Sequence, residues 1–110
     1  MQTPSQEEVR RAVAAARTVV VKVGSSSLTQ PSGHLDVDKL NALVGAIAQV
    51  RMLGGNIVLV SSGAIAAGFG PLGFESRPTD VATQQATASV GQGLLMAQYE
   101  MAFGRYGIRV

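Results

Sequence analysis

Two short Gly/Ser segments contain the residues of this sequence that are best suited to binding an anion. The first is residues 24–27, preceded by Lys22, and the second is residues 61–64. Glycine lets the backbone approach a phosphate closely, serine adds a hydroxyl donor, and successive backbone N–H groups form a nest for an anion. We therefore predict that the two segments bind a phosphate or another anionic group.

Lys22 carries the strongest chemical signal, because it is an ammonium within an otherwise apolar run at residues 19–23. A buried lysine without a partner is costly, and an anion at the end of the strand would supply that partner. In a phosphoryl transfer, the same charge would stabilise the transferred group. Two structural alternatives stay open: the lysine reaches solvent along its own stem, and Gly/Ser loops after strands are plain turns.

Both segments follow runs that predict buried strands of a parallel sheet, at residues 18–23 and 56–60. Ligands of open α/β sheets bind beyond the carboxyl ends of the strands, so we expect both segments at one edge. The residues 107–110 predict the opening of a third strand. One helix is predicted after Ser5, which forms a capping box with Glu8, and a second follows Asp36 and stops at Gly54. A third covers about residues 65–68, and a fourth runs from Thr79 or Asp80 to about Arg105. This alternation is typical of an α/β fold.

The last predicted helix contains two glycines, Gly91 and Gly93, in its interior. Each costs about 1 kcal/mol relative to alanine in a helix, so they indicate either a break or the close approach of another helix. Met96 and Met101 are expected to fill the core. The apolar stripe predicted for this helix consists of Val90, Leu94, Ala97 and Met101, with Leu95, Tyr99 and Ala102 beside it.

Composition excludes several classes of protein and site. The 110 residues have a formal net charge of +2, with no basic stripe that would indicate nucleic-acid binding. Without cysteine, there is no disulfide or thiolate nucleophile, and His34 is expected in a solvated loop, so no metal site is predicted. No apolar run reaches the roughly 18 residues of a membrane span, and no secretory signal is recognisable, so we expect a cytoplasmic protein.

Three segments resemble, in order and spacing, the N-terminal signatures of the glutamate 5-kinase group within the amino acid kinase family. They are VVKVGSSSL at residues 20–28, IVLVSSGAIAAG at residues 57–68 and QQATASVGQ at residues 84–92. The resemblance implies an α/β/α sandwich, with residues 1–17 as a variable helical leader and residues 18–110 as the N-terminal part of the kinase domain. It also implies ATP and Mg²⁺ as cofactors and transfer of the γ-phosphate to the side-chain carboxylate of L-glutamate, the first step of proline biosynthesis.

The same resemblance implies a role for individual residues. Lys22 would be catalytic and would contact the phosphates of ATP, together with the phosphate-binding residues Gly24, Ser25 and Ser26. Ser62 would bind glutamate, and Gly63 with Ala64 would supply adjacent backbone groups.

A chain that stops inside an apparent strand would leave an exposed sheet edge, so we expect an incomplete domain that is inactive alone. The resemblance places the acidic active-site residue, a second catalytic lysine and most of the adenine pocket beyond residue 110, and it implies a homo-oligomer at full length. Two alternatives stay open. One is another member of the family, such as acetylglutamate kinase or carbamate kinase, which residues 61–68 disfavour. The other is a non-catalytic module that binds phosphate or a nucleotide.

Overall fold

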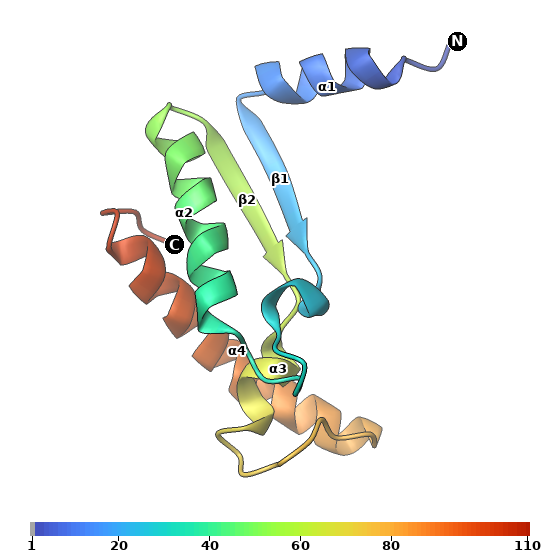
Figure 1. Cartoon of the computed structure of the whole chain (residues 1–110), viewed down its shortest axis with the longest axis vertical. Coiled ribbons are helices and arrows are strands. Elements are labelled where there is room, and N and C mark those ends of the chain that lie inside the picture. The colour runs from blue at the N-terminus through green and yellow to red at the C-terminus, as the bar shows by residue number, and fades with distance from the viewer. Residues whose placement is uncertain (1) are drawn as a thin grey trace.

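Two parallel strands form the centre of the structure, a computed structural model that describes residues 2–110. The strands β1 (Thr18–Val23) and β2 (Asn56–Ser61) pair in register from Thr18 opposite Asn56 to Val23 opposite Ser61. A crossover through the helix α2 (Val37–Met52) connects them (Figure 1). The prediction of an α/β fold with a parallel sheet is therefore confirmed, with β2 one residue longer than expected.

The predicted helix starts are confirmed by their caps. In α1 (Gln6–Ala15), the Ser5 hydroxyl accepts from the Glu8 N–H and the Glu8 carboxylate accepts from the Ser5 N–H. Asp36 caps α2 by accepting from two backbone N–H groups, and Asp80 caps α4 (Val81–Gly104) by accepting from the backbone N–H and the hydroxyl of Thr83. Such side-chain oxygens satisfy backbone donors that have no partner inside the helix. Two short elements complete the structure, the 3₁₀ turn η1 (Ser25–Leu28) and the helix α3 (Ala64–Phe69).

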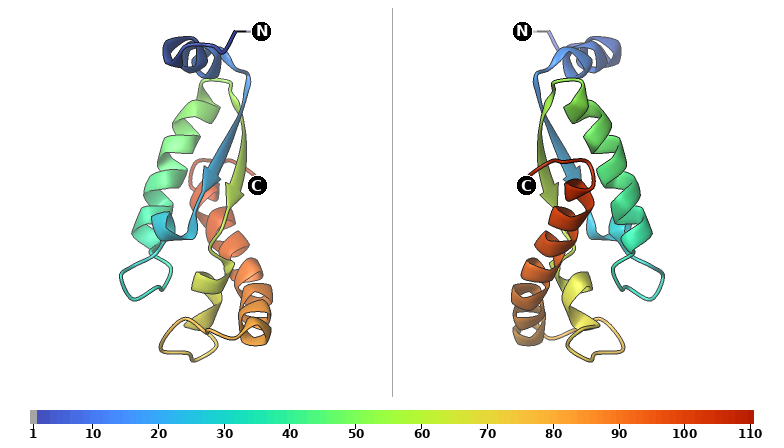
Figure 2. Two further views of the ribbon diagram at one scale, coloured as in Figure 1. Left: turned by 90° about the vertical axis from the view of Figure 1, so that its right-hand side faces the viewer. Right: turned by 90° about the vertical axis from the view of Figure 1, so that its left-hand side faces the viewer.

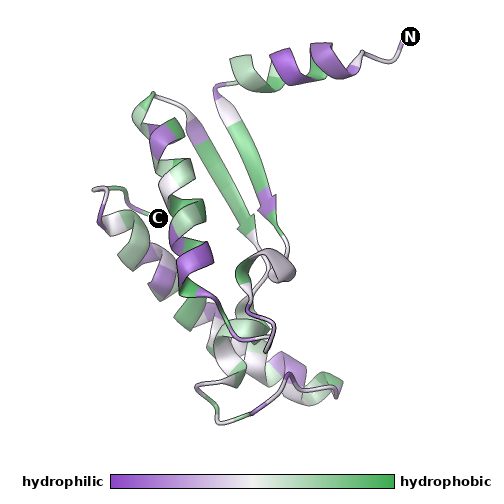
Figure 3. Cartoon of the chain, in the orientation of Figure 1, coloured by the Kyte–Doolittle hydropathy of each residue, from purple (hydrophilic) through white to green (hydrophobic). Residues whose placement is uncertain are grey.

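The core lies on one face of the sheet, where α2 and α4 pack beneath the strands (Figure 2). Its buried residues include Val23 from β1, Leu40 and Val44 from α2, and Leu95 and Phe103 from α4. Within residues 2–110, the other face of the sheet is bare, although Figure 3 shows apolar residues along both strands. Val20 on that face is 64% exposed, so the prediction of fully buried strands is correct for the inner face only.

Of the two adjacent apolar stripes predicted for α4, the first faces outward and the second is buried, so the expectation that Met96 and Met101 fill the core is wrong. Val90, Leu94 and Met101 are exposed, and Met96 is 38% exposed, whereas the neighbouring stripe of Leu95, Tyr99 and Ala102 is buried. The reason is a contact with α3 that fixes the rotation of α4: Gly91 faces α3, and residues four and eight positions later share that face. Sequence periodicity alone cannot distinguish two adjacent apolar stripes.

The residues 107–110 do not form the predicted third strand. Gly107 has a positive φ of 70°, which turns the chain, and the N–H of Ile108 donates to the Phe103 carbonyl oxygen. This hydrogen bond folds the segment back over the end of α4. Within residues 2–110, the sheet therefore has two strands.

The helix α1 stands apart from this core. It contributes no buried residue and lies beyond the amino end of β1 (Figure 1). Within residues 2–110, no helix has both the length and the apolarity needed to cross a membrane.

Two leucines, one buried in the core and one exposed, allow the described core to be tested. Leu40 is fully buried in α2, whereas Leu53, just after the same helix, is 89% exposed. We expect Leu40→Ala to lower the free energy of unfolding by about 2–5 kcal/mol, because it leaves a cavity in the core. Leu53→Ala is the matched control and should stay within about 0.5 kcal/mol of the parent. Equilibrium urea unfolding measures both values, and equal losses would contradict the described core.

Candidate functional site

The two Gly/Ser segments lie side by side at the carboxyl end of the sheet. Parallel pairing places Val23 opposite Ser61, so both strands end at the same edge. The N–H of Ser62 then donates to the Val23 carbonyl oxygen over 3.0 Å, which ties the start of the second segment to the end of β1. The segments are therefore neighbours in space, although residues 28–60 separate them in the sequence.

A cavity of about 240 Å³ joins the two segments. Ser25 lines it from one side, and Ser62, Gly63 and Ala64 line it from the other. The remaining lining residues are Ile65, Ala66, Arg77 and Ala88. The charged residue in this set is Arg77, and no carboxylate is present, so the lining favours an anionic ligand.

The other predicted phosphate-binding residues lie near this cavity without lining it. Gly24 has an extended conformation just before η1, and it and Ser26 are exposed. The Gly24 carbonyl oxygen accepts from the Ser27 N–H over 3.1 Å, so the serines form a tight 3₁₀ turn rather than an open loop.

Lys22 is exposed, which corrects the expectation of a buried ammonium. It lies opposite Val60 on the bare face of the sheet, because side chains alternate along a strand and Val21 and Val23 point to the core. No ion pair within residues 2–110 involves Lys22. Because Lys22 is exposed, the cost of burying its charge gives no argument for a bound anion. The observation that supports an anion is the position of Lys22 in the sequence, two residues before Gly24.

Helix α3 begins at Ala64, the last residue of the second segment, and spans only six residues. Its dipole is correspondingly weak, so the donors of the site are the backbone and hydroxyl groups of the segment itself. Gly63 before it is buried, and a Cβ at this position would lie 3.7 Å from a methyl group of Leu95. The second segment therefore rests on α4.

Helices α3 and α4 meet through glycine. A Cβ built on Gly91 would collide with the Ala64 carbonyl oxygen and would lie 2.9 Å from the Gly68 nitrogen. A Cβ on Gly68 would in turn collide with the Thr87 carbonyl oxygen. Only residues without side chains allow this backbone approach. The sequence prediction of a close approach is confirmed at Gly91, whereas Gly93 has open space around it.

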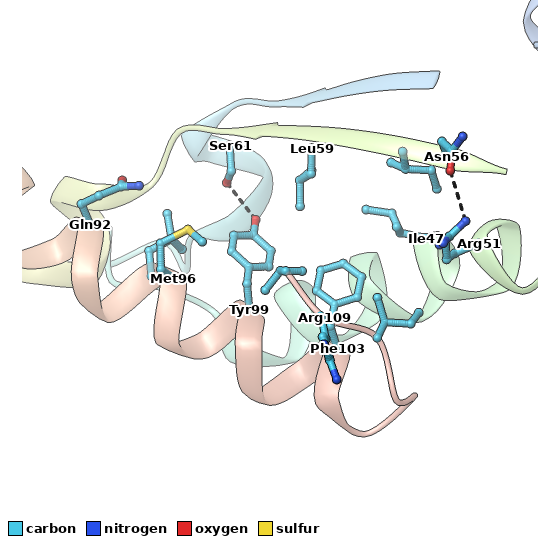
Figure 4. Close-up of a pocket in the computed structure, with 14 residues that line it drawn as sticks. Ile47, Arg51, Asn56, Leu59, Ser61, Gln92, Met96, Tyr99, Phe103 and Arg109 are labelled. Carbon is cyan, nitrogen blue, oxygen red and sulfur yellow. Dashed lines mark hydrogen bonds between the residues drawn. The ribbon is translucent and has the colours of Figure 1, made fainter. Parts of the chain in front are cut away.

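A second, larger cavity of about 440 Å³ lies between the inner face of β2 and the helices α2 and α4 (Figure 4). Apolar side chains such as Leu59 and Phe103 line its middle, and Arg51 donates to the Asn56 amide oxygen at one end. It contains no residue of the two Gly/Ser segments apart from Ser61. We therefore place the candidate site at the smaller cavity.

Ser61 and Tyr99 share a hydrogen bond of 2.8 Å at the other end of the larger cavity (Figure 4). Tyr99 is only 3% exposed. Burial raises the pKa of the Tyr99 hydroxyl, and the hydrogen bond with Ser61 partly offsets this increase. The hydroxyl therefore stays protonated and can keep the hydrogen bond at neutral pH.

Sequence reasoning missed Arg77, which carries no local signal, and it named Ala88 only as part of the segment at residues 84–92. His34 lies in a loop as predicted, but its ring is packed against a neighbour. The imidazole of His34 is half-buried and packs against the Phe69 ring, with 4.3 Å between ring centroids. The cause is the loop before α2, which folds back onto the end of α3. Among residues 2–110, no group of three or more His, Cys, Asp or Glu residues is arranged to hold a metal ion.

Comparisons with known proteins identify relatives of this sequence. Residues 17–110 match the family model described as the amino acid kinase family. The whole chain is 81% identical to a protein named glutamate 5-kinase from Bifidobacterium longum, of which it covers 29%. It is 76% identical to a glutamate 5-kinase from Bifidobacterium adolescentis, again over 29% of that protein. Over 92% of the chain, it is 60% identical to a Streptomyces coelicolor glutamate 5-kinase, covering 27% of it. The chain thus spans less than a third of the length of these curated relatives.

The contact between α3 and α4 predicts opposite effects for two glycine substitutions in one helix. Gly91→Ala should lower the free energy of unfolding by about 1–3 kcal/mol, because the methyl group must push α3 away. Gly93→Ala should raise it by up to about 1 kcal/mol, because alanine favours a helix and this position is open. Thermal or urea unfolding of both variants is the measurement. A Gly91→Ala variant as stable as Gly93→Ala would show that the helices do not meet here.

Proposed function

The chain belongs to the amino acid kinase family, and we propose that it forms the substrate-binding edge of an enzyme that phosphorylates L-glutamate. The γ-phosphate of ATP would pass to the side-chain carboxylate, giving glutamyl 5-phosphate and ADP. The observation that carries this proposal is the single cavity shared by Ser25 and Ser62. One segment would bind the phosphate donor and the other the acceptor, so both reactants would meet in one place.

The lining of the cavity suits an acidic amino acid. Ser62, Gly63 and Ala64 would offer a hydroxyl and backbone groups to glutamate, and Arg77 adds a positive charge without a carboxylate partner in the lining. The volume of about 240 Å³ suits a ligand the size of an amino acid. ATP would lie outside it, with its phosphates toward Ser25 and the exposed Gly24 and Ser26.

Lys22 would act as the catalytic cation. Its exposed ammonium, on a flexible stem two residues before Gly24, can reach phosphate oxygens beyond the end of β1. A cation held there would stabilise the charge on the transferred group. Mg²⁺ would enter with the phosphates of ATP, because the described residues offer no set of carboxylates to hold it.

We further propose that residues 18–110 are the N-terminal part of a longer kinase domain and that residues 1–17 are a leader. The coverage of less than a third of the relatives supports this proposal. The remaining part of the domain would add an acidic residue, a second lysine and most of the adenine pocket. The complete enzyme would be cytoplasmic and homo-oligomeric.

The direct test uses an extended chain, in which residues 1–110 are joined to the remaining part of the Bifidobacterium longum relative. We expect this extended chain to phosphorylate glutamate when ATP and Mg²⁺ are present, and the 110-residue chain alone to be inactive. A coupled assay for ADP release measures both. Turnover of acetylglutamate or carbamate in place of glutamate would reject the proposed substrate, and ligand binding without turnover would indicate a non-catalytic module.

The role of Lys22 is tested with Lys22→Met, which keeps most of the stem and removes the charge. Turnover of the extended chain should fall at least about a hundredfold, because the lost cation acts mainly in the transition state. Stability should hardly change, since Lys22 is exposed. Lys39→Met is the matched control, because Lys39 is also exposed and its ammonium donates to the Thr29 carbonyl oxygen away from the cavity. Turnover of Lys22→Met within about threefold of the Lys39→Met value would reject the catalytic role.

A further inference from the structure

The inner face of β2 changes from apolar to polar at its last residue. Ile57 and Leu59 pack against the core, and Ser61 is the next inward residue, with a hydroxyl group in place of an apolar side chain. A buried hydroxyl without a partner is costly. The Tyr99 hydroxyl supplies that partner at 2.8 Å, and it comes from α4 (Figure 4).

Successive turns of α4 contact three of the four residues of the second Gly/Ser segment. Tyr99 holds Ser61, Leu95 packs against Gly63, and Gly91 meets the Ala64 carbonyl. These α4 residues are four apart, so they lie on one face of the helix. Ser62 is the one residue of the segment that these contacts skip, and it is exposed and lines the cavity.

The contact at Tyr99 is a hydrogen bond, whereas the contacts at Leu95 and Gly91 are packing contacts. Packing at Gly63 and Ala64 limits how closely the segment approaches α4, but it is not directional. A hydrogen bond fixes a direction as well as a distance. Among residues 2–110, Ser61–Tyr99 is the side-chain hydrogen bond that links the sheet to α4. It therefore fixes the Ser61 side chain at the end of β2, directly before Ser62, whose N–H donates to the Val23 carbonyl oxygen.

We propose that Tyr99 is a positioning residue for the phosphoryl acceptor: by holding Ser61, it aims the Ser62 hydroxyl and the backbone of residues 62–64 into the cavity. This proposal rests on the proposed function, in which Ser62 binds glutamate. Tyr99 itself does not line that cavity and acts only through Ser61.

The first test is Tyr99→Phe in the extended chain, which keeps the ring in the core and removes the hydroxyl. The KM for glutamate should rise about ten- to a hundredfold, since small displacements of a positioning group have effects of that size. The KM for ATP should stay within about twofold of the parent, because the phosphate segment follows β1 and not β2. Tyr106→Phe is the matched control, since Tyr106 lies outside both Gly/Ser segments and is 43% exposed.

A double variant separates positioning from stability. In Ser61→Ala with Tyr99→Phe, neither polar group is left without a partner, so the melting temperature should recover relative to the single variants. The KM for glutamate should stay raised, because the directional link is still absent. Ser61→Thr keeps the hydroxyl and should keep a KM close to the parent value. A double variant in which the KM recovers together with the melting temperature would overturn the proposal.

Hydrogen–deuterium exchange of the segment at residues 61–64 gives a readout that does not depend on activity. Exchange should be faster in Tyr99→Phe than in Tyr106→Phe. If the parent extended chain phosphorylates glutamate and Tyr99→Phe changes neither the KM nor the exchange, this inference is wrong and the proposed function stands. If the parent does not phosphorylate glutamate, the proposed function is wrong, and the exchange comparison still decides whether Tyr99 orders the segment.

Discussion

The backbone contact between α3 and α4 is the constraint on which the rest of the site depends. At Gly68 and Gly91 the two helices approach so closely that a side chain on either residue would collide with the other helix. This contact fixes the rotation of α4, and the rotation brings Leu95 and Tyr99 under the end of β2. The position of the second Gly/Ser segment follows, because Gly63 and Ala64 rest on the same face of α4.

In the proposed site, exposed residues would touch the substrates and buried residues would support them. The groups proposed to touch substrates, Lys22, Ser25 and Ser62, lie at or near the surface, so holding their polar atoms costs little desolvation. Their support is buried: Tyr99 and Leu95 beneath one segment, and the hydrogen bond from Ser62 to Val23 between the two strands. If this cavity receives the substrate as proposed, buried support of this kind would order it before a ligand arrives and lower the cost of binding.

Local signals in the sequence were sufficient for the helices, for β1 and β2, and for the edge where the segments meet. The caps at Ser5, Asp36 and Asp80 are contacts within a few residues, and the strands are short apolar runs whose parallel order places their ends together. Local signals failed at residues 107–110, where Gly107 turns the chain and no strand forms. The other errors concern contacts between distant residues. The buried side of α4 depends on Gly91 meeting α3, the exposure of Lys22 depends on which face the helices cover, and Arg77 reaches the cavity from a loop without a pattern.

In the proposed site, one cavity supported by α4 receives the acceptor beside the phosphate segment. Amide resonances of Ser25 and of residues 62–64, recorded by NMR on the extended chain while glutamate is added, test it most directly. We expect the Ser62, Gly63 and Ala64 amides to shift on adding glutamate. A nonhydrolysable ATP analogue should then shift Ser25 and strengthen glutamate binding. Saturating glutamate that shifts other regions and leaves residues 62–64 unchanged would contradict it.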